Sequence, residues 1–330
     1  MIIYRADKFS VSIFDENTFE KVGQYNYTTS NKNIIGINNL CIFDNIIIIT
    51  IDLYDEEDDD ISIATYDVVF YDYLKNEVVD ICTNISFLGL HIYDVILTNN
   101  NYLIFKSLKF LFIKKLNYSQ DGNYSFKHVS LYETGDCSIS FTHDNYILIC
   151  STQFIKKVNI FINEEILIYD RFIPNSISNS ISNLISFSYN VSSTKFKVDI
   201  IDYNVDTQDC NLISTIEPSF YSYNVFIKFS KLNRNIVAIA SHDNLEIYDI
   251  NSSLCVFEIK DILLRKIEGI DFIVNSSQNE LLICLLSDNT IKVYQCNECN
   301  EWREIFTIED NIKSWGKYLA CSSYKPTILW

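Results

Sequence analysis

Alternating apolar and polar positions, interrupted by short polar turns, dominate the C-terminal third of the chain. Residues 236–249 read IVAIASHDNLEIYD, and residues 281–295 read LLICLLSDNTIKVYQ. Each stretch combines an apolar strand, a turn that carries Asp-Asn, and an alternating strand that contains a tyrosine near its end. The two turns lie 45 residues apart, and a constant spacing of this size indicates a structural repeat.

The same strand–turn–strand unit recurs along the rest of the chain. We assign eight such hairpins, at residues 2–15, 45–72, 101–116, 146–162, 184–203, 236–249, 281–295 and 318–330. Weaker strand-like segments lie between many of them, so that one unit comprises four short strands. Helix-period runs of ten or more residues are not found, whereas β-branched and aromatic residues are abundant, which favours strands throughout.

Four antiparallel strands in about 45 residues are typical of a β-propeller blade. A length of 330 residues favours seven blades, and the eight hairpins leave eight as the alternative. The first hairpin lacks a preceding strand and the last lacks a following one, so we expect the two ends to complete one blade and close the ring. The sequence thus predicts an all-β, single-domain propeller over residues 1–330, with an acidic loop insertion at 52–60 and a Ser/Asn-rich loop at 174–183.

Composition restricts the partners and the compartment that we expect. The net charge of −17 argues against broad binding to nucleic acid or to anionic lipid. The N-terminus carries charged residues where a signal peptide would be apolar, and the apolar runs are too short to span a membrane. Ten scattered cysteines, several in apolar strands, fit buried free thiols. We therefore expect a soluble protein of the cytoplasm or nucleus.

Two C-terminal segments resemble the WD-repeat propellers. Residues 240–259 place Tyr248-Asp249 where that family has Trp-Asp, and residues 285–295 place Tyr294-Gln295 there. The chain has neither a Gly-His nor a Trp-Asp dipeptide. The resemblance implies a non-catalytic protein–protein interaction scaffold, a subunit or adaptor of an intracellular complex. The loops that would bind a protein partner comprise His242, Asp243, Asn244, Asp288 and Asn289.

The segment 253–272 is also similar in layout to the phosphoinositide-binding propellers called PROPPINs. Those proteins carry Phe-Arg-Arg-Gly where this chain has Ile259–Ile262, so both arginines are missing. Because the planar guanidinium binds phosphate with two hydrogen bonds, their loss removes most of the expected affinity. A residual patch of Lys260, Arg265 and Lys266 leaves weak contact with phosphoinositides, or with membrane-trafficking partners, as the alternative function.

Other patterns point away from metal ions, cofactors and catalysis. Cys296 and Cys299 have the spacing of half a zinc site, but no second close pair of Cys or His accompanies them, so we interpret them as part of a turn. We find no nucleophile elbow, phosphate-binding glycine loop or zinc-binding His-Glu-x-x-His motif. The sequence therefore predicts no enzyme activity, no cofactor, no metal site and no small-molecule substrate.

The acidic run in the 52–60 insertion is the most charged segment of the chain. It lacks the alternating ligands and the glycine of a calcium-binding loop. Like charges in an uninterrupted row repel one another and stay solvated, so a basic protein partner is the ligand that this loop would fit. The run comprises Asp55, Glu56, Glu57, Asp58, Asp59 and Asp60.

Overall fold

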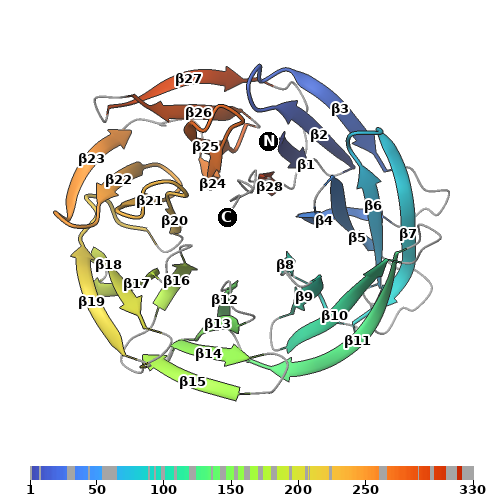
Figure 1. Cartoon of the computed structure of the whole chain (residues 1–330), viewed down its shortest axis with the longest axis horizontal. Helices are drawn as coiled ribbons and strands as arrows, with labels where there is room; N and C mark the ends of the chain where they lie inside the picture. Colours follow the sequence, from blue (N-terminus) through green and yellow to red (C-terminus); the bar gives the residue numbers. More distant parts are fainter. Residues whose placement is uncertain are drawn as a thin grey trace, which may run out of the picture. The chain divides into compact units, whose positions relative to one another are not determined.

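The computed structural model of the chain (Figure 1) consists of β-strands joined by turns and loops. It describes residues 2–6, 9–27, 34–43, 45–53, 65–87, 90–92, 94–97, 101–107, 110–118, 124–134, 137–141, 146–151, 155–159, 164–169, 174–179, 184–192, 195–204, 207, 209–222, 225–259, 266–288, 290–297, 301–309 and 318–321. These residues form seven four-stranded antiparallel sheets and no helix. In particular, they contain no helix of the length and apolarity needed to cross a membrane. The predicted all-β propeller of four-stranded antiparallel blades is confirmed.

The chain divides into two compact units, of which the first comprises Met1–Gly135 and Ile312–Ser322. It contains three blades. The first blade has the order β28 (Tyr318–Cys321), β1 (Ile2–Ala6), β2 (Ser10–Asp15), β3 (Lys21–Asn26). The second has β4 (Ile34–Phe43), β5 (Ile46–Leu53), β6 (Thr65–Asp72), β7 (Glu77–Ser86), and the third has β8 (Asp94–Leu97), β9 (Tyr102–Lys106), β10 (Phe110–Tyr118), β11 (Tyr124–Glu133). Strands from both ends of the sequence therefore share one sheet, because β28 pairs with β1.

The second unit comprises Asp136–Asn311 and Ser323–Trp330 and contains four blades. Two of them are β12 (Cys137–Phe141), β13 (Tyr146–Ser151), β14 (Ile155–Asn159), β15 (Glu164–Tyr169), and β16 (Pro174–Asn179), β17 (Leu184–Ser192), β18 (Lys195–Tyr203), β19 (Cys210–Ile216). The others are β20 (Phe226–Phe229), β21 (Ile236–Ala240), β22 (Leu245–Asp249), β23 (Leu254–Ile259), and β24 (Ile267–Val274), β25 (Glu280–Leu286), β26 (Ile291–Cys296), β27 (Trp302–Ile308). In every blade of this unit the strands lie side by side in chain order.

Each unit is stabilised by packing between the faces of neighbouring blades. In β5, Ile47, Ile49 and Ile51 pack in a cluster with residues of the first blade, whereas Ile46 and Ile48 pack in a cluster with residues of the third. Both faces of this strand are therefore buried, which explains why its sequence is continuously apolar instead of alternating. Burial of each such side chain contributes about 1.5–3 kcal/mol, so stability is a collective property of adjacent blades.

The hairpin between the third and fourth strands has the same construction in three blades. Asp15 accepts hydrogen bonds from the backbone N–H groups of Asn17 and Thr18, at 2.8 and 2.9 Å. Asp72 and Asp249 cap the corresponding turns of their own blades. Four residues after each aspartate, the backbone has a positive φ, at Phe19 (57°), Asn76 (57°) and Ser253 (55°). The aspartates thus satisfy turn N–H groups that the sheet leaves unpaired.

The predicted loop at 174–183 is wrong for its first six residues, which form β16. The strand pairs only with β17 in its sheet, and proline is tolerated at the first residue of such an edge strand. Asp52 and Leu53, predicted to begin the acidic loop, instead end β5, where they pair with Tyr66 and Thr65. The rest of both predicted loops lies outside the described residues.

Candidate functional site

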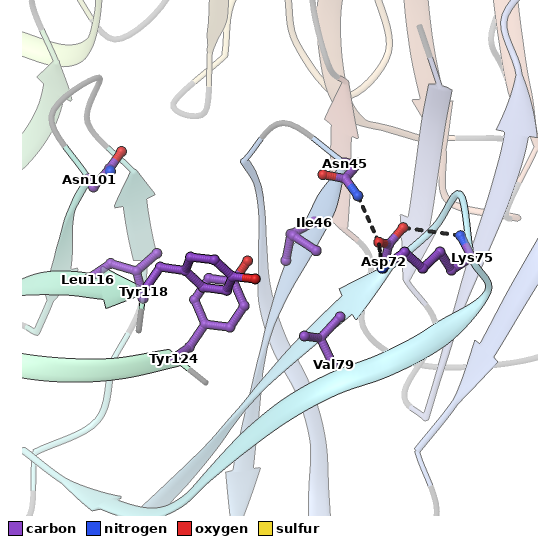
Figure 2. A pocket seen from close by; sticks show the side chains of 9 residues that line it. All are labelled: Asn45, Ile46, Asp72, Lys75, Val79, Asn101, Leu116, Tyr118 and Tyr124. Atoms are coloured by element: carbon purple, nitrogen blue, oxygen red, sulfur yellow. Dashed lines mark hydrogen bonds and ion pairs between the residues drawn. The ribbon is translucent and has the colours of Figure 1, made fainter. Parts of the chain in front are cut away.

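A cleft lies between the second and third blades, within the first unit. Its volume is about 430 Å³. We call it the first cleft, and its lining residues are Asn45, Ile46, Asp72, Lys75, Val79, Asn101, Leu116, Tyr118 and Tyr124. Figure 2 shows the polar groups of the second blade on one side and the two tyrosine rings of the third blade on the other. Clefts of this size accommodate small molecules.

The polar side of the first cleft is organised around the Asp72 carboxylate. Its Oδ1 accepts hydrogen bonds from the N–H groups of Leu74 (3.0 Å) and Lys75 (3.1 Å). Its Oδ2 accepts one from Asn45 Nδ2 (2.7 Å), and Lys75 Nζ lies 3.6 Å from the same oxygen. Burial alone would raise the pKa of Asp72, but these hydrogen bonds and the Lys75 charge outweigh it, so the pKa is lowered. The carboxylate is therefore ionised at neutral pH, and it orients Asn45 and Lys75.

The aromatic side of the first cleft is a stack of rings from two blades. Tyr124 lies parallel to Phe70, with ring centroids 4.3 Å apart. Tyr118 lies 4.9 Å from Tyr124 and is 65% exposed. The Tyr124 backbone N–H also donates to Asp80 of β7 at 2.6 Å, which fixes the start of β11 against the second blade. The wall is therefore held against the second blade at Tyr124 and is exposed to solvent at Tyr118.

A second cleft has the equivalent position in the second unit. It lies between the β20–β23 and β24–β27 blades, and its volume is about 190 Å³. Its lining residues are Asn233, Ile236, Asp249, Val256, Glu280, Cys296 and Trp302. The equivalence follows from the register, because Ile46 pairs with Asp72 in the first blade pair and Ile236 pairs with Asp249 in the other.

Glu280 distinguishes the second cleft from the first. Its carboxylate accepts hydrogen bonds from Ser230 Oγ (2.6 Å) and from the N–H groups of Lys231 (2.5 Å) and Leu232 (3.1 Å) of the neighbouring blade. Burial raises the pKa of Glu280 in spite of these hydrogen bonds and the nearby Lys231 charge. The side chain thus links two blades across the cleft, and we assign it a structural role.

The predicted partner-binding residues that the structure describes, His242, Asp243, Asn244 and Asp288, lie at the ends of their strands opposite to the second cleft. The Asp243-Asn244 turn joins β21 to β22, and His242 Nδ1 lies 3.2 Å from the carbonyl oxygen of Ile267 in the next blade. Asp288 accepts a hydrogen bond from the Thr290 N–H at 3.0 Å. These contacts stabilise turns, and the binding role of the loops stays a prediction.

Several other predicted site residues lie outside the described part of the chain. These are Asp55, Glu56, Glu57, Asp58, Asp59, Asp60, Lys260, Arg265, Asn289 and Cys299. Lys266 is described, and its N–H donates to Ser287 Oγ at 2.9 Å. Cys296 lines the second cleft, and burial raises the pKa of its thiol. Among the described residues, no three His, Cys, Asp or Glu side chains are placed to hold a metal ion.

The residues of the first cleft are not among the site residues predicted from the sequence. One signal was present, because an aromatic residue followed by aspartate recurs at the end of the third strand as Phe14-Asp15, Tyr71-Asp72 and Tyr248-Asp249. Only the last pair was recognised. Tyr118 carries no comparable signal, since its role depends on which blade packs beside it.

Comparisons with known proteins agree with the fold. No protein-family model and no curated protein sequence matches the chain. Among solved structures, it is similar to a candidate 6-phosphogluconolactonase from Bacteroides uniformis, with a TM-score of 0.66, 13% identity and coverage of 97% of this chain and 99% of that one. For a candidate 6-phosphogluconolactonase from Bacteroides fragilis, the TM-score is 0.64 and the identity 13%, with coverage of 97% of this chain and 98% of that one. For Sqt1 from Chaetomium thermophilum, the TM-score is 0.56 and the identity 13%, with coverage of 82% of this chain and 71% of that one.

These matches correct two of our expectations. We expected a non-catalytic scaffold, with a weak phosphoinositide-binding propeller as the alternative, and no enzyme. The structures that match the chain almost from end to end are instead candidate enzymes. Our expectation came from analogy with one class of propeller, and a fold shared by enzymes and other proteins gives no argument against catalysis.

Proposed function

We propose that this protein is an enzyme that hydrolyses a small sugar-derived lactone, with the first cleft as its substrate site. The observation that carries this proposal is the match over 97% of the chain to two candidate 6-phosphogluconolactonases, of which 99% and 98% are covered. At 13% identity this likeness concerns the fold.

The first cleft offers the groups that such a reaction requires. In lactone hydrolysis, water adds to the ester carbonyl carbon, and the ring C–O bond then breaks to give the hydroxy acid. The carbonyl oxygen becomes negatively charged, so a hydrogen-bond donor or cation beside it lowers the barrier. The Lys75 ammonium and the Asn45 amide are donors of this kind, and the Asp72 carboxylate orients both.

The test is a hydrolysis assay on the purified full-length chain. We expect acid release from gluconolactone or 6-phosphogluconolactone, followed in a pH-stat, to exceed the spontaneous rate in proportion to protein concentration. The Lys75→Gln variant should lose about 100-fold of the catalysed rate, the usual effect of removing one such donor. Lys21→Gln, an exposed lysine on the first blade, is the matched control and should keep the wild-type rate. A rate equal to that of buffer with both lactones contradicts the proposal.

We also infer that the propeller is of the WD-repeat type. The support is structural, because Asp15, Asp72 and Asp249 cap the turn after the third strand of their blades, at the position of the aspartate in Trp-Asp. A homologous sequence with Trp-Asp at these positions would strengthen this inference. Homologues that lack the aspartate in all three blades would contradict it.

A further inference from the structure

We propose that the substrate of the first cleft is a neutral, polyhydroxylated ring, such as a saccharide or its lactone, and that it stacks on Tyr118. The lactone part of this statement rests on the proposed function. The specificity for a neutral ring rests on the geometry of the cleft and separates this chain from an enzyme for phosphorylated substrates.

An exposed aromatic surface lines one side of the first cleft. Tyr118 lines the cleft and is 65% exposed, and its ring contacts Tyr124, which in turn stacks on Phe70. A flat apolar ring beside polar groups suits a ligand that has one apolar face and polar edges. A pyranose or a six-membered lactone has this character, because its C–H groups form a face and its hydroxyl groups point outward.

Two asparagine amides lie at the edges of the first cleft. Asn45 comes from the turn before β5, and Asn101 comes from the residue before β9 of the next blade. An asparagine amide both donates and accepts hydrogen bonds, as a hydroxyl group does. Figure 2 shows Asn45 and Asn101 on opposite sides of the cleft, so a ring between them can meet an amide at either edge.

The charges around Lys75 disfavour an anionic ligand in the first cleft. Lys75 Nζ lies 3.6 Å from Asp72 Oδ2 and 3.8 Å from Glu77 Oε1, so one cation is shared by two carboxylates. A phosphate dianion placed on Lys75 would therefore also meet both negative charges. The chain as a whole carries −17, which further disfavours the approach of an anion. A neutral ring avoids both costs.

The second cleft shows what the same position looks like without these features. Its volume is less than half that of the first, and its aromatic residue, Trp302, is only 7% exposed. Glu280 crosses between the two blades there. None of the described residues that line this cleft presents an exposed aromatic ring, and we expect the cleft to bind no saccharide.

The binding test uses methyl β-glucopyranoside as the probe in saturation-transfer NMR with the full-length chain. We expect signal transfer to the ring protons with wild-type protein and about a tenfold loss of affinity in Tyr118→Ala, the usual order for one lost stacking contact. Phe306→Ala removes another exposed aromatic ring, on β27, and should bind as wild type does. Equal binding by all three proteins, or none by wild type, overturns the proposal.

A kinetic comparison separates this inference from the proposed function. We expect kcat/KM for gluconolactone to exceed that for 6-phosphogluconolactone by about tenfold or more, consistent with rejection of the phosphate charge. Hydrolysis that favours the phosphorylated lactone supports the proposed function and overturns the neutral-ring inference. Binding of the glucoside that depends on Tyr118, without hydrolysis of either lactone, supports the inference about the cleft and overturns the proposed function.

Discussion

The first and second clefts occupy equivalent positions, each between two adjacent blades and beside an aspartate that caps the hairpin after the third strand. In the first, Asn101 and the exposed Tyr118 leave a space of about 430 Å³. In the second, Glu280 reaches the neighbouring blade, and about 190 Å³ remains. The repeat therefore determines where a cleft can form, and a few side chains of the next blade determine whether it is open.

The largest effect should come from removing the link across the second cleft. Glu280→Ala leaves the N–H groups of Lys231 and Leu232 and the Ser230 hydroxyl without their acceptor. We expect the free energy of unfolding to fall by about 3 kcal/mol, measured by urea denaturation. Glu309→Ala, at an exposed position after β27, is the control and should change it by less than about 0.5 kcal/mol. If both variants lost the same free energy of unfolding, Glu280 would not stabilise the contact between the two blades.

A somewhat smaller effect should follow from removing Asp72, which caps the hairpin beside the first cleft. Asp72→Ala takes away the acceptor for the Leu74 and Lys75 N–H groups and for the Asn45 amide, and we expect a loss of about 2 kcal/mol. Asp72→Asn retains one acceptor oxygen and should lose less. If neither variant changes the urea midpoint, the carboxylate does not organise this hairpin.

The two carboxylates should give stability opposite dependences on pH. The lowered pKa of Asp72 contributes stability that is present above its usual value of 3.8 and is lost as the pH falls through the folded-state pKa. The raised pKa of Glu280 contributes stability that is present below 4.5 and is lost as the pH rises through the folded-state pKa. We expect two trends in the urea midpoint as the pH rises from about 3 to 7. The midpoint of wild type should increase relative to that of Asp72→Asn, and it should decrease relative to that of Glu280→Gln. If the difference in midpoint between wild type and variant changed in the same direction for Asp72→Asn and Glu280→Gln, the opposite pKa shifts of the two carboxylates would be contradicted.

The smallest effect concerns the hairpins beside the clefts. The residue with positive φ is Asn76 beside the first cleft and Ser253 beside the second. Asparagine tolerates this conformation better than serine, so Ser253→Asn should raise the free energy of unfolding by about 0.5 kcal/mol. The gain is reduced by loss of the hydrogen-bond contact between Ser253 Oγ and Ser214 Oγ. Ser253→Val is the opposing variant, and a higher thermal midpoint for it would contradict the argument.

Much of the fold could be predicted because strong hairpins repeat. β21 and β22 lie within the predicted hairpin at 236–249, and β25 and β26 match the one at 281–295 except at their ends. β4 and β8 were not predicted. β4 contains Gly36 and the pair Asn38-Asn39, and its register shifts beside both, so its alternation is broken. β8 has only four residues, too few to show a period.

The first cleft could be predicted only in part. Tyr71-Asp72 repeats a pattern that was visible in the sequence, and its hairpin could have been assigned from Tyr248-Asp249. The place of Tyr118 depends on the length of β10, which continues past Leu116 and brings the ring beside Tyr124. This proximity arises from the register between β10 and β11, in which Tyr118 pairs with Tyr124, and alternation within one strand does not encode that register.

The pairing of β28 with β1 has a consequence for how the chain is made. More than 300 residues separate Ala6 from its partner Tyr318. At a typical elongation rate, a ribosome needs on the order of tens of seconds to synthesise that length. During this interval β1 emerges without its neighbour, and its unpaired edge is a site at which another chain can attach. Among the seven blades, the one whose first strand is translated earliest is thus completed last, and its edge stays unpaired until β28 has been made.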